Sequence, residues 1–229
     1  LFPYTTLFRS VPINTLEQGG AFTIVTNDGF IKQTTLSDML PKAYKKKTSM
    51  AIKLKTDDSY VVNADYFETV GQQDVLLLSQ HGVGLRFAVK SIPEIGARTA
   101  GVKAMDLRNE DTIKAAVFVT NEAQRVAIMA DNGAFKYMPV SEITRSKRAN
   151  KGLLIFTQKK TVAYHVATAT ILNIEDTALE ILTTRWQKQE LQLSDYKPSQ
   201  RVGNGQYVVD VKKYGEPWRV QPLTIAKTK

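Results

Sequence analysis

The stretch Val126-Ala-Ile-Met-Ala-Asp-Asn-Gly-Ala-Phe-Lys136 holds two short apolar segments on either side of an Asn-Gly pair. Apolar runs that flank such a pair are a strong local signal for a β-hairpin. Three further copies of the pattern occur, with Gly29, Gly82 and, in the last copy, Trp186 at the turn position of Gly133. Successive turn positions are 53, 51 and 53 residues apart. A period this regular indicates a repeat architecture.

A second landmark follows each hairpin, 15 or 16 residues after the turn. There, a basic residue precedes a turn of small residues and another apolar segment; these basic residues are Lys45, Arg98, Arg148 and Arg201. Within the third copy the pattern predicts four strands, at about 125–130, 134–141, 152–157 and 161–168, each rich in residues that favour strands. No segment sustains a 3.6-residue apolar period over three turns, so helices are not expected.

Four-stranded units that repeat about every 50 residues predict an all-β fold. We expect a β-pinwheel, a propeller-like array of about four four-stranded blades that forms an incomplete ring. The repeats would run from about 20–70, 71–122, 123–175 and 176–229, as one domain over 20–229. A β-sandwich with accidental spacing is the alternative.

Residues 1–19 precede the first repeat. The chain begins with Leu, and residues 1–10 match neither the repeat nor a secretion signal. We therefore expect the chain to be a piece of a longer protein. A cloning remnant and an assembly artefact are both open as explanations of residues 1–10.

The composition is that of a basic, folded protein. The 229 residues include 31 Lys and Arg against 22 Asp and Glu, which gives a formal net charge of +9. A hydrophobic content of 43% is enough for a core, so the charge does not mark a disordered tail. The absence of cysteine excludes disulfides and thiolate chemistry and fits a reducing compartment. We expect a cytoplasmic, nucleoid-associated protein; its longest apolar runs are too short to span a membrane, but peripheral electrostatic attachment stays open.

Groups suited to catalysis are sparse. The two histidines, His81 in a hairpin turn and His165 in a strand, fit ordinary structural roles. The two-glycine turns Gly82-Val-Gly84 and Gly203-Asn-Gly205 lack the following helix that would bind a phosphate, and no P-loop motif occurs. The sequence therefore predicts no catalytic residue, no cofactor site and no metal site in this chain.

The positive charges recur once per repeat. In a stacked or closed array they would line one rim and form a track suited to a polyanion. Single-strand binding would favour aromatic residues among these charges, and only Tyr44 and Tyr137 lie near the basic turns. Duplex DNA is therefore the expected ligand. The competing interpretation is that these are solvated turn residues that contribute only solubility.

A family resemblance rests on the block Gly96-Ala-Arg-Thr-Ala-Gly-Val-Lys-Ala-Met105, together with the hairpins around Gly29, Gly82 and Gly133. These segments resemble the C-terminal β-pinwheel repeats of bacterial type IIA topoisomerase A subunits, over about residues 20–215. Within that family the later repeats resemble the topoisomerase IV branch of Gram-positive bacteria more than the gyrase branch, which is the second alternative.

The resemblance implies a non-catalytic domain that binds and bends the transported DNA duplex. The parent enzyme would decatenate replicated chromosomes and relax supercoils as an A2B2 heterotetramer. ATP and Mg²⁺ would be bound through the B subunit, which contacts a region N-terminal to this chain. A basic β-propeller module that binds an acidic protein or a membrane surface is the alternative from another class.

The resemblance also implies which residues contact DNA. The implied set is Lys45, Lys46, Lys47, Arg98, Lys103, Arg148, Lys151 and Arg201, with Lys32, Arg86 and Lys136 as a second set. The fourth copy departs from the pattern, since it has Trp186 at the turn and few charges near Arg201. We expect this copy chiefly to cap the array.

Overall fold

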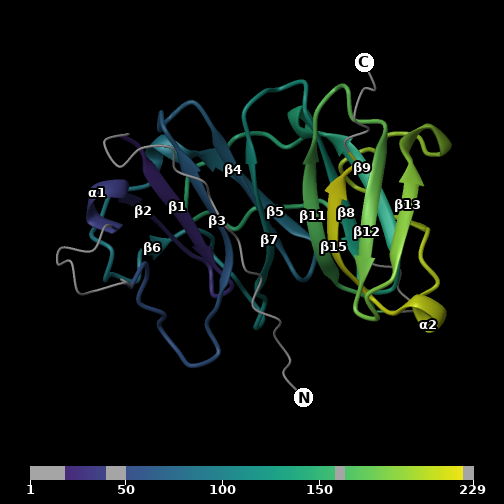
Figure 1. Cartoon of the computed structure of the whole chain (residues 1–229), viewed down its shortest axis with the longest axis horizontal. Coiled ribbons are helices and arrows are strands. Elements are labelled where there is room, and N and C mark those ends of the chain that lie inside the picture. Colours follow the sequence, from purple (N-terminus) through teal and green to yellow (C-terminus); the bar gives the residue numbers. More distant parts are fainter. Residues whose placement is uncertain (1–18, 40–49, 158–162, 224–229) are drawn as a thin grey trace.

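Four antiparallel sheets stand side by side along the long axis of the molecule (Figure 1). The computed structural model describes residues 19–39, 50–157 and 163–223. Nearly all the regular structure in these ranges is β-strand, as the repeat pattern predicts. The helical elements are the short α1 (Leu36–Met39) and α2 (Val211–Tyr214) and the 3₁₀ turns η1 (Val89–Ser91), η2 (Val140–Glu142) and η3 (Leu193–Asp195).

Each sheet, or blade, is built on one hairpin. In spatial order, the first blade consists of β3 (Val61–Phe67), β1 (Ala21–Thr26), β2 (Phe30–Thr35) and β6 (Val102–Lys103). The second consists of β7 (Ile113–Val119), β4 (Asp74–Ser79), β5 (Val83–Ala88) and β10 (Leu153–Leu154). The third consists of β11 (Val166–Leu172), β8 (Arg125–Ala130), β9 (Ala134–Pro139) and β14 (Gln206–Tyr207), and the fourth of β15 (Pro217–Pro222), β12 (Ala178–Thr183) and β13 (Lys188–Gln192).

The short strand of each four-stranded blade comes from the following repeat. The strand predicted at 152–157 does not join the third blade; it forms β10, in which Leu153 pairs with Gly84 of the second. The strands β6 and β14 cross in the same way, to the first and third blades. The blades therefore do not coincide with the sequence repeats. The strand predicted at 161–168 begins later, at Val166, and the one predicted at 134–141 ends at Pro139.

The close approach of the short strands requires glycine. A Cβ on Gly101 would lie 2.7 Å from the Ile31 carbonyl oxygen, and one on Gly152 would lie 2.6 Å from that of Gly84. Both residues also have a positive φ, of 92° and 80°. Only glycine meets both conditions without strain, so these positions are what lets one repeat lie against the preceding blade.

The blades pack face to face, and the core lies between them. On β4, Val75 and Leu77 belong to a cluster shared with the first blade, whereas Leu76 and Leu78 belong to one shared with the third. All six residues of β4 are buried for this reason. A strand with two covered faces shows a continuous apolar run instead of an alternation.

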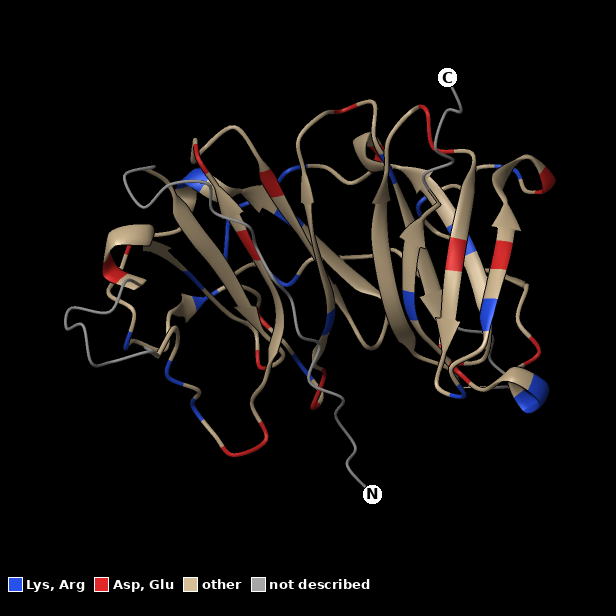
Figure 2. Cartoon of the chain, viewed as in Figure 1, with Lys and Arg blue, Asp and Glu red and all other residues tan. Residues whose placement is uncertain are grey.

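Only one face of the fourth blade is covered by a neighbouring blade. On β12, Ala178, Leu179 and Ile181 are buried, whereas β13 exposes Lys188 and Glu190. Figure 2 shows an acidic residue on β12 and both acidic and basic residues on β13. The fourth blade therefore has a polar outer face, unlike the second blade, whose strand β4 is buried throughout.

The two edges of the sheets differ. The edge strands β3, β7, β11 and β15 contact one another in that order, so they form the inner side of the array. The short strands β6, β10 and β14 lie at the opposite, outer edge. The loops that lead into them, which carry the basic landmarks, therefore follow the outer edge. No helix in the described part of the chain is long and apolar enough to cross a membrane.

Candidate nucleic-acid interface

Three of the predicted DNA-contacting residues are buried. Lys32, Arg86 and Lys136 are exposed by only 0%, 4% and 2%. Their expected place on an exposed rim is therefore wrong. All three lie on the second strand of a hairpin and donate hydrogen bonds to carbonyl oxygens of the following repeat.

Lys32 and Lys136 join successive repeats. The Nζ of Lys32 donates to the carbonyl oxygens of Gly96 and Ala97, each at 2.8 Å. The Nζ of Lys136 donates to those of Gln200 and Arg201, at 3.0 and 2.9 Å, and to that of Ile155 at 2.7 Å. The carbonyl oxygens thus take the place of water around each ammonium. The ammonium in turn provides hydrogen bonds to carbonyl groups that would otherwise be buried without a partner.

Burial lowers the pKa of Lys136 to about 8. Between pH 8 and about 10.5 the unfolded chain keeps a proton that the folded chain has lost, so the free energy of unfolding rises with pH. We expect this contribution to grow by about 2 kcal/mol from pH 7.5 to 9.5. Urea unfolding at the two pH values measures it, and Lys136→Met should lack it. An unchanged slope in that variant would show that the carbonyl oxygens keep the ammonium charged.

Arg86 faces the opposite way because it lies one residue further along its strand. Leu77 pairs with Leu85, as Ile24 pairs with Lys32, so Leu85 holds the lysine position in the second blade. Arg86 Nε instead donates to Asp74 Oδ2 at 2.8 Å, and its Nη1 donates to the Val140 carbonyl oxygen at 3.1 Å.

Asp74 is the centre of a buried ion-pair network. Its Oδ2 also accepts a hydrogen bond from Arg145 Nε at 2.9 Å, and the carboxylate is only 2% exposed. Arg86 completes the network through Glu122, whose pKa it lowers by hydrogen bonding to the carboxylate. The network joins the second blade to the turn before β8, through Glu122, and to the loop after η2, through Arg145.

Arg148 and Arg201 are half-buried and hold the short strands in place. Arg201 Nη1 donates to the Leu154 carbonyl oxygen at 2.8 Å, and Arg148 Nη1 donates to the equivalent carbonyl oxygen of Lys103. Both guanidinium groups thus bind the last residue of the preceding short strand. Their regular recurrence in the sequence reflects this structural role at least in part.

Arg98, Lys103 and Lys151 are exposed on the outer edge, as predicted. Lys103 forms an ion pair with Asp106 and lowers the pKa of that carboxyl group, chiefly by hydrogen bonding. Lys45, Lys46 and Lys47 lie outside the described residues. The set implied by the resemblance omits three exposed cations of the same loops, Arg108, Arg145 and Lys147, although Arg145 and Lys147 crowd the same turn in the sequence.

Six of the exposed cations lie on the outer edges of the first two blades. We call this set the basic edge; it consists of Arg98, Lys103, Arg108, Arg145, Lys147 and Lys151. Around the short strand of the third blade, in contrast, the exposed residues include Val202, Asn204 and Tyr207. The positive track therefore does not continue evenly along all the blades.

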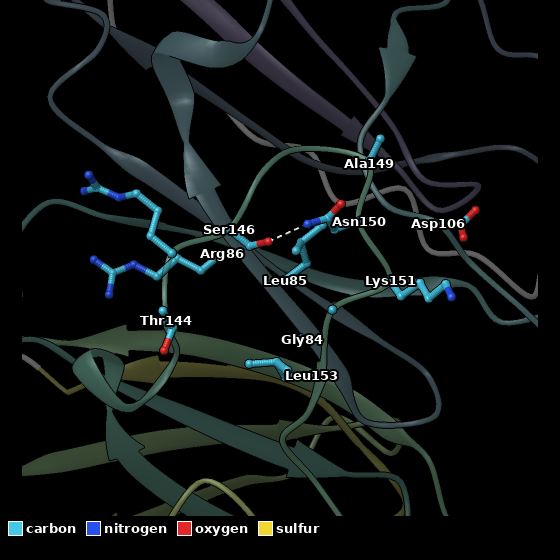
Figure 3. A pocket seen from close by; sticks show the side chains of 12 residues that line it. Gly84, Leu85, Arg86, Asp106, Thr144, Ser146, Ala149, Asn150, Lys151 and Leu153 are labelled. Atoms are coloured by element: carbon cyan, nitrogen blue, oxygen red, sulfur yellow. Dashed lines mark hydrogen bonds between the residues drawn. The ribbon is translucent and has the colours of Figure 1, made fainter.

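A hollow of about 520 Å³ opens beside the basic edge, between β5 and the loop at 144–153. Figure 3 shows Lys151 and Asp106 on one side of it and Arg86 on the other. Leu85 lines the hollow at the position that Lys32 and Lys136 hold in the neighbouring blades. In the second blade, therefore, no lysine at this position donates to the carbonyl oxygens of the loop at 144–153. Arg145 and Lys151 also line it and can offer donors to an anionic group.

The two histidines lie in adjacent blades with their ring centres 5.7 Å apart. His165 Nδ1 lies 3.1 Å from Asp131 Oδ2, and His81 Nδ1 lies 3.4 Å from Asp111 Oδ1. Each aspartate also accepts a hydrogen bond from the backbone N–H of its histidine. Aspartate side chains commonly form such bonds in turns, so both pairs fit a structural role. The described ranges hold no group of three or more His, Asp or Glu residues placed to bind a metal.

Comparison with known families accounts for the strand pattern. The family model described as the DNA gyrase C-terminal domain, beta-propeller, matches residues 23–65, 73–120 and 124–161, which is more than half of the chain. The chain belongs to this family. The resemblance inferred from the glycine turns is thereby confirmed, and so is the β-pinwheel class of the fold.

Relatives of this gyrase-type C-terminal domain include the A subunit of DNA topoisomerase 4 from Streptococcus pyogenes serotype M1, which is 30% identical over 210 residues. That alignment covers 83% of this chain and 25% of the relative. The same subunit of Bacillus subtilis (strain 168) is 25% identical, over 94% of this chain and 26% of the relative. The A subunit of DNA gyrase from Staphylococcus epidermidis is 27% identical, over 92% and 24%. The domain spans about a quarter of the length of these relatives.

Solved structures show the same fold. The crystal structure of the C-terminal domain of DNA topoisomerase IV has a TM-score of 0.83 at 26% identity, and the match covers 92% of this chain and 64% of that one. The DNA gyrase A C-terminal domain has a TM-score of 0.76 at 20% identity, over 91% and 67%. The family match ends before the fourth copy, which is also the copy that departs from the glycine pattern.

Proposed function

We propose that this gyrase-type C-terminal domain binds duplex DNA within the A subunit of a topoisomerase IV. The observation that carries the proposal is the basic edge, six exposed cations on the outer edges of two adjacent blades. The relatives named as A subunits of DNA topoisomerase 4 support the choice of parent enzyme.

The chemistry of the basic edge suits a phosphate backbone. A duplex carries one negative charge per ~1.7 Å of its axis, and each phosphate that a lysine or arginine neutralises releases bound counterions. This affinity does not depend on base sequence, as expected of a domain that handles DNA segments of any sequence. A duplex that follows a curved edge must bend, which costs a few kcal/mol that the added phosphate contacts offset.

In the parent enzyme the domain would hold and bend the transported segment during ATP-dependent decatenation and supercoil relaxation. The partner would be the B subunit, in an A2B2 heterotetramer that uses ATP and Mg²⁺ and acts in the cytoplasm at the nucleoid. The A subunit of a gyrase is the second candidate, because a gyrase relative is nearly as similar. A basic module for an acidic protein or membrane surface is the candidate from another class.

Charge reversal of Arg98, Lys147 and Lys151 to glutamate is expected to weaken duplex binding at least 100-fold near 100 mM salt. Three lost phosphate contacts should also reduce the slope of log K against log[salt] by about 3 × 0.9. Fluorescence anisotropy with a labelled duplex over a salt series measures both effects. All three side chains are exposed, so the melting temperature should change little.

The matched control reverses three equally exposed cations away from the basic edge, Lys90, Lys188 and Arg219. It changes the net charge by the same amount and should retain most of the affinity. Equal weakening by both triple variants would show that binding depends only on net charge. Wild-type affinity in the first variant would overturn the assignment of the basic edge.

A further inference from the structure

Both tryptophans of the chain meet at one end of the fourth blade. The rings of Trp186 and Trp218 lie edge to face, with their centres 5.7 Å apart and their planes at 74°. Trp186 is 65% exposed, which makes it one of the largest apolar side chains on the described surface. It lies in the turn between β12 and β13, at the end of the blade where α2 lies in Figure 1.

The turn presents Trp186 at a conformational cost. Its φ is 60°, in the left-handed region where the other three copies carry Gly29, Gly82 and Gly133. A bulky residue with this φ is a genuine outlier, because a side chain makes the left-handed conformation less favourable than it is for glycine. Nothing in the hairpin itself requires an indole here, so the exposed ring calls for a role outside the turn.

Hydrogen bonds hold the turn firmly against the segment that follows α2. Trp186 N–H donates to the Thr183 carbonyl oxygen at 2.9 Å, and Thr184 N–H donates to that of Glu216 at 2.8 Å. Arg185 Nη1 donates to the carbonyl oxygens of Lys212 and Lys213, each at 2.9 Å. The backbone that carries Trp186 is therefore held against α2 and the segment that follows it.

Three cations lie in the segments that carry and contact this turn, since Arg185 precedes Trp186 and bonds to Lys212 and Lys213 of α2. Arg185, Lys212 and Lys213 are exposed, and Figure 2 shows α2 as a basic element at this end of the molecule. The nearby acid Asp210 is occupied as the N-cap of α2, where it accepts the N–H groups of Lys212 and Lys213. Glu216 is the other acidic residue of this segment.

We propose that Trp186, Trp218, Arg185, Lys212 and Lys213 form a binding site for a single-stranded polynucleotide. An unpaired base stacks on the exposed face of Trp186, and the flanking phosphates contact Lys212 and Lys213. Exposed aromatic rings interleaved with cations are the usual platform for single strands, because every base has a π-face. This site is separate from the basic edge, which contains no exposed aromatic ring and lies on the first two blades.

The same features argue against a membrane surface as the ligand. Trp186 is the single large exposed apolar residue of the cluster, and α2 has only four residues, two of them lysines. An interfacial helix needs a broad apolar face that enters the acyl region. One indole with cations in the adjacent segments matches a base and its phosphates instead.

The test uses intrinsic fluorescence, because both tryptophans of the chain lie in the site. Titration with an oligothymidylate of about 12 nucleotides, within the usual site size of ~4–16, should quench the emission to saturation. The variant Trp186→Gly keeps the turn residue of the other copies, so it should fold. Its affinity for a labelled oligothymidylate should fall ~5- to 150-fold, which is the range for one lost stacked base. Trp186→Phe should restore most of the affinity.

Several outcomes would overturn the site. These are an absence of quenching, wild-type affinity in Trp186→Gly, and a loss of oligothymidylate binding in the basic-edge triple variant but not in Lys212→Glu with Lys213→Glu. A blue shift with anionic phosphatidylglycerol vesicles but no response to the oligonucleotide would assign the surface to lipid. Equal binding of oligouridylate and oligothymidylate would support recognition of the base and phosphate, which RNA and DNA share. A preference for one of them would identify the ligand as single-stranded RNA or single-stranded DNA. Duplex affinity over the salt series reports separately on the basic edge.

Discussion

Replacing Gly82 by alanine is expected to lower the free energy of unfolding by about 3 kcal/mol or more. The added Cβ would lie 2.2 Å from the Phe156 carbonyl oxygen, which belongs to the backbone of the next repeat and cannot rotate away. The φ of 81° adds the strain of a left-handed conformation. Urea unfolding followed by far-UV circular dichroism measures the change.

The matched controls are Trp186→Gly and Trp186→Ala, which compare glycine and alanine at the same turn position in the fourth blade. No following repeat covers this turn in the described part of the chain, and the Trp186 side chain is already 65% exposed. We expect the alanine variant to be less stable than the glycine variant by ~1–2 kcal/mol, which is the cost of the left-handed conformation alone. A difference as large as the cost of Gly82→Ala would show that local strain, not the contact between repeats, makes Gly82 necessary.

Asp74→Ala is expected to cost about 3–5 kcal/mol of the free energy of unfolding, because it leaves the guanidinium of Arg86 buried without its buried counterion. Arg86 is 4% exposed and Asp74 is 2% exposed, so water cannot replace the carboxylate. The variant also releases Arg145, which shares the same carboxylate oxygen. Thermal and urea unfolding should agree on the loss.

Glu122→Ala is the control for this network, since Glu122 binds the same guanidinium but its side chain is 63% exposed. The control should be milder than Asp74→Ala, because water reaches the site of Glu122 and Asp74 still pairs with Arg86. Replacing both Asp74 and Arg86 by apolar residues should recover part of the loss, because no buried charge is then left unpaired. A severe effect of Glu122→Ala with a mild effect of Asp74→Ala would reverse the assignment of the network's centre.

These stabilising contacts and the basic edge depend on each other. The loop that carries Arg145, Lys147 and Lys151 is held through Asp74 and by the donation of Arg148 to the Lys103 carbonyl oxygen. Exposed cations on a fixed loop keep a constant spacing, which favours simultaneous contact with several phosphates. Loss of the Asp74 network is therefore expected to weaken DNA binding indirectly, at temperatures where the fold persists.

Much of the fold follows from short-range patterns. The hairpins, their 51- and 53-residue intervals and the turn role of Trp186 could all be predicted, because a glycine turn between apolar runs is a local property of the backbone. The exchange of the short strands could not. A strand of two residues, such as β10, has too little pattern to indicate its partner, and the partner is chosen by the close packing of Gly152 on Gly84.

The candidate site was likewise predictable only in part from the sequence. The sequence placed a basic residue in every repeat, and Arg98, Lys103 and Lys151 are indeed exposed. It could not separate these from Lys32, Arg86 and Lys136, because a lysine that binds backbone carbonyl oxygens and a lysine that faces solvent have the same local pattern. The one-residue offset of Arg86 within its strand was also hidden, although it turns the side chain to the other face of the sheet.

The amino-acid sequence by itself thus determined the repeat, the hairpins, the all-β class and the excess of positive charge. The packing of one repeat on the next decided which blade each short strand joins and which cations stay at the surface. The physical reason is that turn conformation and face alternation depend on neighbours within a few residues. The burial of a charge depends instead on carbonyl groups about 64 residues away, such as the Gly96 and Gln200 acceptors of Lys32 and Lys136.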